Sequence, residues 1–255
     1  MTGSEGASPA RRLAAWGLVA AALLVGPSRA ADGLQGSLAL TTDYVHRGIS
    51  QSDGGLALQG SLTYWHPTGF YIGAWGSSLD GNYAYVYPQS AGKRAAPMEL
   101  DVFAGFGKPV GTDWMLDFKT VGYLYPDDPA PVSYNYVEFS AGAAWRQRWY
   151  ATVAITPRTT WVARGGAGRN RTAVNAELAW QQPLNAWLTA SAGAGYRELI
   201  APGRSGYLYG SAALALPLRR GSLELGWFTT DSTARWLFGS HLAGNRAALT
   251  ATVNF

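Results

Sequence analysis

Three histidines are the side chains of this sequence best suited to act as general bases near neutral pH: His46, His66 and His241. A hydrolase or acyltransferase would place one of them beside a serine and an acid or amide. Asp43 and Ser50 lie within four residues of His46. Ser240 precedes His241, whereas His66 stands beside Pro67, as in a turn. Because a triad is assembled in space, such spacing does not identify one, and an enzyme is the weaker alternative.

Metal and phosphate chemistry are not favoured. The chain has no cysteine, three scattered histidines and no acidic loop with the spacing of a calcium-binding helix–loop–helix. The glycine run at residues 165–168 lacks the Lys-Ser/Thr pair of a phosphate-binding loop. It therefore predicts a flexible loop, with Arg169 and Arg171 at a solvated tip. The sequence predicts no metal site and no cofactor.

Charged side chains alternate with apolar ones in many short segments. In residues 98–106, for example, Glu99 and Asp101 alternate with Met98, Leu100 and Val102. Successive side chains of a strand point to opposite faces, so one face is charged and the other apolar. The charged positions of this kind are Asp43, Glu99, Asp101, Asp117, Lys119, Glu138, Glu177 and Glu224.

Twelve segments show this period of two. Their ranges are 34–44, 55–65, 70–77, 98–106, 114–124, 134–145, 149–156, 172–180, 186–196, 206–216, 222–229 and 245–255. The first range places Tyr44 on the same apolar face as Leu38 and Leu40. The last range has the length of about 9–11 residues that a tilted strand needs to cross a bilayer. It ends on Phe255, and a closing strand with an aromatic end is common in bacterial outer-membrane barrels.

The connections between these segments alternate in length. Those after the second, fourth, sixth, eighth and tenth segments are short, and the others are longer and rich in Gly, Ser, Asp, Arg and Pro. Short periplasmic turns opposite longer outer loops predict an all-β fold, a transmembrane antiparallel up-and-down β-barrel of about twelve strands.

Aromatic residues beside the short turns predict an interfacial girdle. They are Tyr64, Trp65, Phe70, Phe106, Trp114, Trp145, Trp149, Trp180, Trp187 and Phe255. The alternative, core aromatics of a soluble β-sandwich or lipocalin-like barrel, does not explain their clustering at one end of successive hairpins.

The N-terminal residues 1–30 have the pattern of a cleaved signal peptide. Arg11 and Arg12 precede an apolar stretch at 13–25, and small residues follow at 28–30. A retained anchor helix would need about 20 apolar residues. We therefore predict the barrel for residues 31–255. Loss of three arginines and one glutamate lowers the net charge from +4 to +2, too near neutral to indicate a nucleic-acid partner.

The run RGISQSD at residues 47–53 resembles the TorF family of porin-like proteins, formerly catalogued as proteobacterial proteins of unknown function. Residues 58–60, 69–77, 99–101, 125–126 and 134–138 also resemble that family, so the specific matches cover roughly residues 37–140. The second half resembles it only in strand pattern and in the terminal phenylalanine. The resemblance implies an outer-membrane barrel and, more weakly, passive solute diffusion, without naming a solute.

In such a barrel the charged faces would line the lumen, and we predict the eight charged positions above, with Arg47, as pore-lining. Arg47 stands where the first strand meets the first outer loop. It either contacts a solute or pairs with an inward carboxylate such as Asp43, and the pairing is favoured. Carboxylates outnumber Lys119 along the predicted wall, so the sequence predicts a weak preference for cations.

The predicted function is a passive channel for small hydrophilic solutes. A non-conducting structural or adhesion barrel is the main alternative, and an outer-membrane lipid-modifying enzyme is the other. The predicted partners are small solutes, outer-membrane lipid, lipopolysaccharide phosphates at the loop arginines, and the barrel-assembly machinery, which would recognise the C-terminal strand ending in Phe255.

Overall fold

The computed structural model describes residues 33–79, 97–126, 133–163, 166–200 and 206–255. The predicted signal peptide at residues 1–30 lies outside these ranges. No helix within the described residues is long and apolar enough to cross a membrane.

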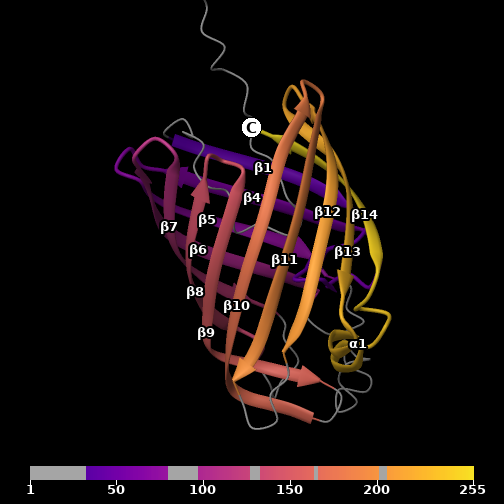
Figure 1. Cartoon of the computed structure of the whole chain (residues 1–255). Helices are drawn as coiled ribbons and strands as arrows, with labels where there is room; N and C mark the ends of the chain where they lie inside the picture. The colour runs from indigo at the N-terminus through magenta and orange to yellow at the C-terminus, as the bar shows by residue number, and fades with distance from the viewer. Residues whose placement is uncertain (1–32, 80–96, 127–132, 164–165, 201–205) are drawn as a thin grey trace, which may run out of the picture.

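Twelve antiparallel strands close into a barrel, in which each strand pairs with its neighbours in the chain and the last pairs with the first (Figure 1). The strands are β1 (Gly33–Thr41), β4 (Ala57–Trp65), β5 (Phe70–Ser78), β6 (Met98–Val110), β7 (Trp114–Leu124), β8 (Tyr136–Trp145), β9 (Trp149–Ala163), β10 (Gly166–Asn185), β11 (Leu188–Ile200), β12 (Tyr207–Leu218), β13 (Gly221–Thr230) and β14 (Arg246–Asn254). The predicted fold class is confirmed.

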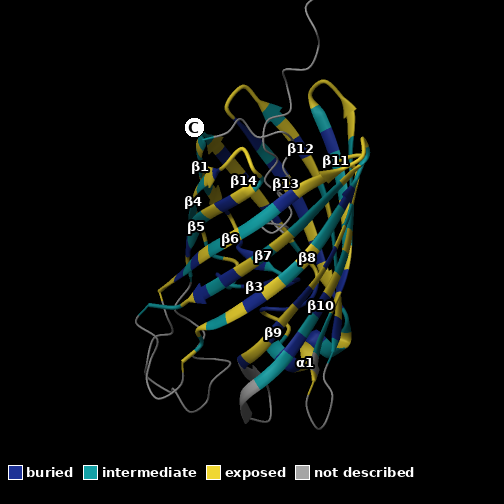
Figure 2. Ribbon diagram, turned by 90° about the vertical axis from the view of Figure 1, so that its left-hand side faces the viewer, coloured by how far each residue is buried: buried dark blue, intermediate teal, exposed yellow. Residues whose placement is uncertain are grey.

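The outer face of the barrel is apolar. Exposed and buried residues alternate along the strands (Figure 2). Leu38, Leu58, Phe118, Leu178 and Val253 are all exposed on that face, although they are large and apolar. An apolar wall of this area would be unfavourable in water, whereas the hydrocarbon of a membrane solvates it. The chain is therefore a transmembrane barrel of the bacterial outer membrane.

Closure depends on a close approach between the two terminal strands. The N–H of Gly36 donates to the carbonyl of Phe255 at 2.8 Å, and the N–H of Phe255 donates to the carbonyl of Gly36 at 2.9 Å. A Cβ at Gly36 would lie 2.4 Å from the Phe255 ring as it is placed, so the ring packs directly over this glycine. The terminal phenylalanine noted in the sequence thus covers the seam between β1 and β14.

The two ends of the barrel differ, as predicted. The short turns between β4 and β5, β6 and β7, β8 and β9, β10 and β11, and β12 and β13 gather at the end where the C-terminus lies (Figure 1). The helix α1 (Ser232–Phe238) lies at the opposite end. Short turns with the C-terminus identify the periplasmic end of an outer-membrane barrel, and the other end is the outer end.

One predicted outer loop is wrong. Residues 166–168 of the glycine run belong to β10 and pair with residues 161–163 of β9. The ladder continues because glycine weakens a strand but still offers both backbone hydrogen-bonding groups to its partner. The predicted solvated tip at Arg169 and Arg171 is therefore part of a long, irregular hairpin, with register shifts between Gly168 and Ala173.

The aromatic girdle is confirmed with one exception. Tyr64, Phe70, Trp114, Trp149, Trp187 and Phe255 are exposed on the outer face. The register joins Trp114 to Trp145, Trp145 to Trp149 and Trp149 to Trp180, so these rings follow one row around the periplasmic end. Trp65 was wrongly included, because strand alternation places it inward of Tyr64, where its ring contacts Tyr71 at 4.4 Å between centroids.

The first strand is shorter than predicted. β1 ends at Thr41, and residues 42–56, which we call the inserted segment, turn into the barrel instead of continuing the wall. Tyr44 is consequently buried in the lumen, and its prediction as an outward residue is wrong. The inserted segment contains a two-stranded hairpin of its own, β2 (Val45–His46) and β3 (Ile49–Ser50).

Candidate functional site

The hairpin of the inserted segment is formed by a turn of two residues. Arg47 and Gly48 lie between His46 and Ile49, with φ angles of 51° and 78°. Two positive φ angles in a two-residue loop are the geometry of a type I′ turn, whose twist matches that of the paired strands. This turn directs the Arg47 side chain away from the hairpin.

Arg47 forms a bidentate ion pair with Glu138 on β8. Its Nη1 donates to Oε2 at 2.8 Å and its Nη2 donates to Oε1 at 2.7 Å, and both side chains are only 2% exposed. Thr156 also donates to Glu138 at 3.0 Å, and Arg197 lies 3.8 Å from the same carboxylate. The prediction that Arg47 pairs with a carboxylate holds, but the partner is Glu138 and not Asp43.

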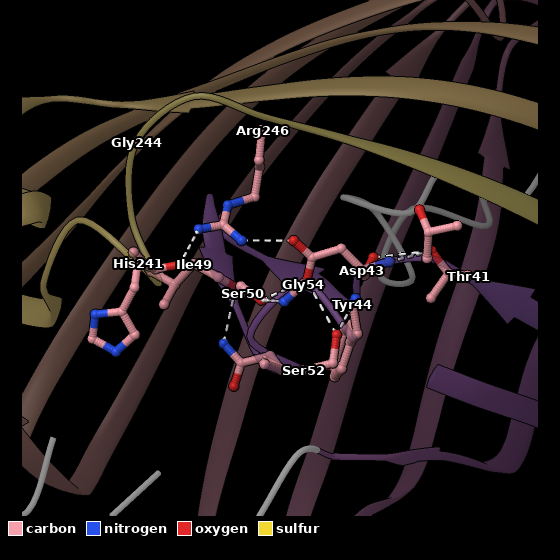
Figure 3. Close-up of polar contacts among 12 residues, drawn as sticks. Thr41, Asp43, Tyr44, Ile49, Ser50, Ser52, Gly54, His241, Gly244 and Arg246 are labelled. Carbon is pink, nitrogen blue, oxygen red and sulfur yellow. Dashed lines mark hydrogen bonds and ion pairs between the residues drawn. The ribbon is translucent and has the colours of Figure 1, made fainter. Parts of the chain in front are cut away.

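Asp43 is engaged elsewhere (Figure 3). Its Oδ2 accepts from Arg246 Nη1 at 2.6 Å, and its Oδ1 accepts from the hydroxyls of Ser50 at 2.5 Å and Ser52 at 3.1 Å. The other terminal nitrogen of Arg246 donates to the carbonyl of His241 at 2.9 Å. Asp43 therefore organises the inserted segment internally and attaches it to the first residue of β14.

The two ion pairs fasten the inserted segment to opposite walls. Around the ring, β14 and β8 are separated by six strand steps in either direction, through β13 to β9 or through β1, β4, β5, β6 and β7. A chain that pairs with Arg246 at one end and with Glu138 at the other must cross the lumen. The inserted segment thus forms a crossbar, that is, a segment that spans the lumen from wall to wall and does not line one wall.

Apolar contacts support the crossbar from the outer end. Ile49 packs in one cluster with Tyr207, Tyr209 and residues of α1 and the chain that follows it, among them Leu237 and Leu242. Val45 packs against Phe228 and Ala248 in a second cluster. The N–H of Ser50 donates to the carbonyl of Leu242 at 2.9 Å. α1 itself begins at the N-cap Asp231, which accepts from the N–H of Ala234.

The remaining predicted pore-lining residues lie on the inner wall. Glu99 and Asp101 of β6 are buried beside the inserted segment, and the hydroxyl of Tyr44 contacts Glu99 at 3.4 Å. Asp117 and Lys119 of β7 are partly accessible, and Asp117 accepts from Tyr71 at 2.8 Å. Two acids lie on other strands: Glu177, which accepts from Tyr209 at 2.6 Å, and the buried Glu224.

Two inward cations were not predicted. Arg197 lies one residue beyond the ninth predicted segment, which ends at 196, so the sequence pattern did not include it in the wall. β11 continues to Ile200, and alternation turns Arg197 inward toward Glu138. Arg246 was not singled out, although its position three residues before Leu249 gives it the inward parity of β14. Extending the ninth segment by one residue would have found Arg197, and Arg246 lay within the last predicted range, 245–255.

The serine and acid near His46 do not form a nucleophile–base pair. Ser50 donates its hydroxyl to Asp43, while the His46 ring lies edge-on to Tyr123 at 6.2 Å between centroids. No group of three or more His, Cys, Asp or Glu residues within the described part of the chain has the geometry to hold a metal ion. This region has the chemistry of buried ion pairing.

Comparisons with known proteins agree with this architecture. A family model described as "Bacterial protein of unknown function (Gcw_chp)" matches residues 28–223. No curated protein matches the chain. The narrower resemblance to the TorF family is not tested by these findings and stays a prediction.

Among solved structures, the chain is similar in fold to the NanC porin, with 8% identity, a TM-score of 0.54, and coverage of 87% of this chain and 98% of that chain. A membrane protein from work on in-meso crystallization gives 8% identity and a TM-score of 0.50 over 87% of this chain and 83% of that one. The KdgM porin gives 5% identity and a TM-score of 0.48, with coverage of 87% and 98%.

Proposed function

The chain belongs to the family described as bacterial proteins of unknown function (Gcw_chp), and we propose that its barrel is a channel for passive diffusion of small hydrophilic solutes. The observation that carries the proposal is the charged inner wall of a closed barrel whose outer wall is apolar. Twelve strands lie between filled eight-stranded barrels and open porins of 16–18 strands, so the path is narrow.

Accessibility along the inner wall supports a path that begins at the periplasmic end. Ser37, Gln59, Ser61, Lys119 and Ser140 point inward and keep part of their surface accessible. Inward residues beside the inserted segment are buried instead, among them Thr41, Glu99 and Glu138. The inserted segment therefore sets the narrowest part of the path.

The same residues favour a weak preference for cations. Among the described residues, the inward acids are Asp43, Glu99, Asp101, Asp117, Glu138, Glu177 and Glu224, and the inward cations are Arg47, Lys119, Arg197 and Arg246. Glu138 and Asp43 pair with arginines, and Asp117 shares β7 with Lys119, so the excess of acids over cations lies on β6, β10 and β13. A solute path lined by carboxylates attracts cations and repels anions.

Planar-bilayer recordings test both parts of this proposal. In a salt gradient the reversal potential of the wild-type protein is expected to show higher permeability for potassium than for chloride. Replacing Glu99 by Gln together with Asp101 by Asn is expected to move the two permeabilities toward equality. Asp113→Asn removes one carboxylate charge from an exposed ion pair outside the lumen and is the control for charge removal as such. Anion preference in the wild type would overturn the assignment of selectivity, and no conductance would overturn the channel.

A non-conducting structural barrel is the second candidate, and one observation favours it. Val45, Arg47, Ile49, Ser50 and Ser52 are almost fully buried in the lumen, as expected of a permanent filling. The two candidates differ in the conductance that they predict before and after displacement of the inserted segment. A channel conducts in the wild type and more when the segment is displaced, whereas a structural barrel is silent in the wild type.

Acid is expected to favour displacement of the inserted segment because of His46. Burial, together with the neighbouring Arg47 and Arg197, lowers the pKa of His46 to about 3, and Glu138 opposes this shift. Outside the lumen its pKa would return toward 6.5. Between these values the displaced state binds more protons, so displacement becomes up to about tenfold more favourable for each pH unit below 6.5.

Conductance as a function of pH measures this effect. The groups that face His46 are Arg47 on its own hairpin, Glu138 on β8, Arg197 on β11 and Tyr123 on β7. Wild-type conductance is expected to rise as pH falls from 7 to 5. His46→Asn, which cannot gain a proton, should flatten that rise. An identical pH response in the variant would assign the effect to another group.

A further inference from the structure

Five basic side chains surround the periplasmic end of the barrel, and we call them the basic rim. They are Lys108 at the end of β6, Arg146 and Arg148 in the turn between β8 and β9, and Arg219 and Arg220 in the turn between β12 and β13. All five are exposed. The acid of these turns within the described residues is Asp113, and it pairs with Arg146 at 3.3 Å.

Each of these cations stands beside a lipid-facing apolar side chain. Lys108 shares the outward parity of Val102 and Phe106 and is opposite Leu116 in the register. The guanidinium of Arg146 lies over the Trp145 ring at 4.9 Å from its centroid, and Arg148 precedes the exposed Trp149. Arg219 and Arg220 follow directly after the exposed Leu218.

Membrane depth follows from these neighbours. The row of tryptophans on β7 to β10 marks the level of the membrane interface, because indole rings prefer that level. Four of the cations lie in the turns at the periplasmic end, close to the depth of lipid phosphates, and Lys108 lies two residues to the membrane side of Val110, which pairs with Trp114. Lys and Arg side chains reach the phosphates by placing their stems along the apolar wall.

From the charge, the apolar neighbours and the depth, we infer that the basic rim binds the phosphate groups of anionic phospholipids in the periplasmic leaflet. A phospholipid offers a phosphate next to acyl chains, which is the combination that each rim position presents. Lipopolysaccharide offers phosphates as well, but it occupies the outer leaflet, at the opposite end of the barrel. Within the described residues, Lys108, Arg148, Arg219 and Arg220 form no ion pair that would compete with a lipid.

Native mass spectrometry of the purified protein with added lipid tests this inference. Phosphatidylglycerol is expected to bind more tightly than zwitterionic phosphatidylethanolamine. Each basic residue near an anionic surface contributes about fivefold to binding. A variant with Lys108, Arg148, Arg219 and Arg220 all replaced by Gln is therefore expected to lose at least about tenfold in phosphatidylglycerol affinity. Its phosphatidylethanolamine binding should not change.

Arg158→Gln combined with Arg171→Gln removes two positive charges from the outer half and is the control. If this control lost phosphatidylglycerol affinity to the same extent, the effect would reflect net charge alone, and the inference would be overturned. The inference would also be overturned if the rim variant bound phosphatidylglycerol as tightly as the wild type, or if it lost affinity only for lipopolysaccharide. If the fourfold variant does not fold, the wild type still decides: its lipid preference must disappear at high salt, because exposed charges are screened. The inference does not depend on conduction through the lumen.

Discussion

Glu138→Gln is expected to release the inserted segment from the lumen and to raise single-channel conductance several-fold. The substitution keeps the shape of the side chain but removes the charge that faces Arg47, which would remain buried without a counter-ion. Removing one partner of a buried pair costs about 3–5 kcal/mol. The ladder of twelve strands is not broken by this change, so the barrel should persist while the segment leaves.

Release can be measured separately from conductance. The chain has no cysteine, so a single Val45→Cys background reports only on residue 45. Val45 is fully buried, and a water-soluble thiol reagent should reach it only when the segment moves. Labelling is expected to accelerate when Glu138→Gln is added. Circular dichroism should still show the strand signal of the closed barrel.

Two controls separate the buried charge from other effects. Asp113→Asn breaks the ion pair with Arg146, whose side chains are 58% and 40% exposed, and it should change neither labelling nor conductance. Arg47→Met combined with Glu138→Met removes both charges of the fully buried pair and should slow labelling again, because neither member of that pair is left without its partner. Equal labelling rates in Glu138→Gln and the wild type would show that the pair does not hold the segment.

The barrel could be predicted from the sequence because its determinants are local and periodic. Alternation in residues 98–106 assigns the apolar side chains to lipid and the acids to the lumen without knowledge of any partner. The same reasoning explains the girdle and its exception. Trp65 follows Tyr64 directly, and two consecutive residues of a strand cannot both face outward.

The inserted segment could not be predicted in this way, because its partners are distant. Thr41, Asp43 and Ser50 allow either a longer strand or a turn into the lumen. The choice depends on Glu138 and Arg246, which lie 91 and 203 residues away from their partners in the chain. One local signal was present: Arg47-Gly48 between two short extended runs suits a two-residue hairpin turn, in which the second residue is commonly glycine.

Gly48→Ala is expected to displace the inserted segment nearly as strongly as loss of the Glu138 charge. A Cβ at this position would lie 2.5 Å from Thr230 Cγ2 and 2.8 Å from Tyr209 Cβ. Both neighbours are buried, and the Tyr209 atom is fixed to its strand, so neither can yield easily. Overpacking typically costs 1–3 kcal/mol, and a positive φ of 78° adds about 1 kcal/mol for a residue with a Cβ.

Gly54 separates the two costs of that substitution. It belongs to the same segment and has a φ of 75°, but nothing lies within 4 Å of an added Cβ. Gly54→Ala should therefore show the backbone strain alone, with a small increase in Val45→Cys labelling, while Gly48→Ala shows strain and clash together. Conductance should follow the same order. Equal labelling in the two variants would mean that the hairpin turn is not packed against β12 and β13, and the crossbar would lose its support at that wall.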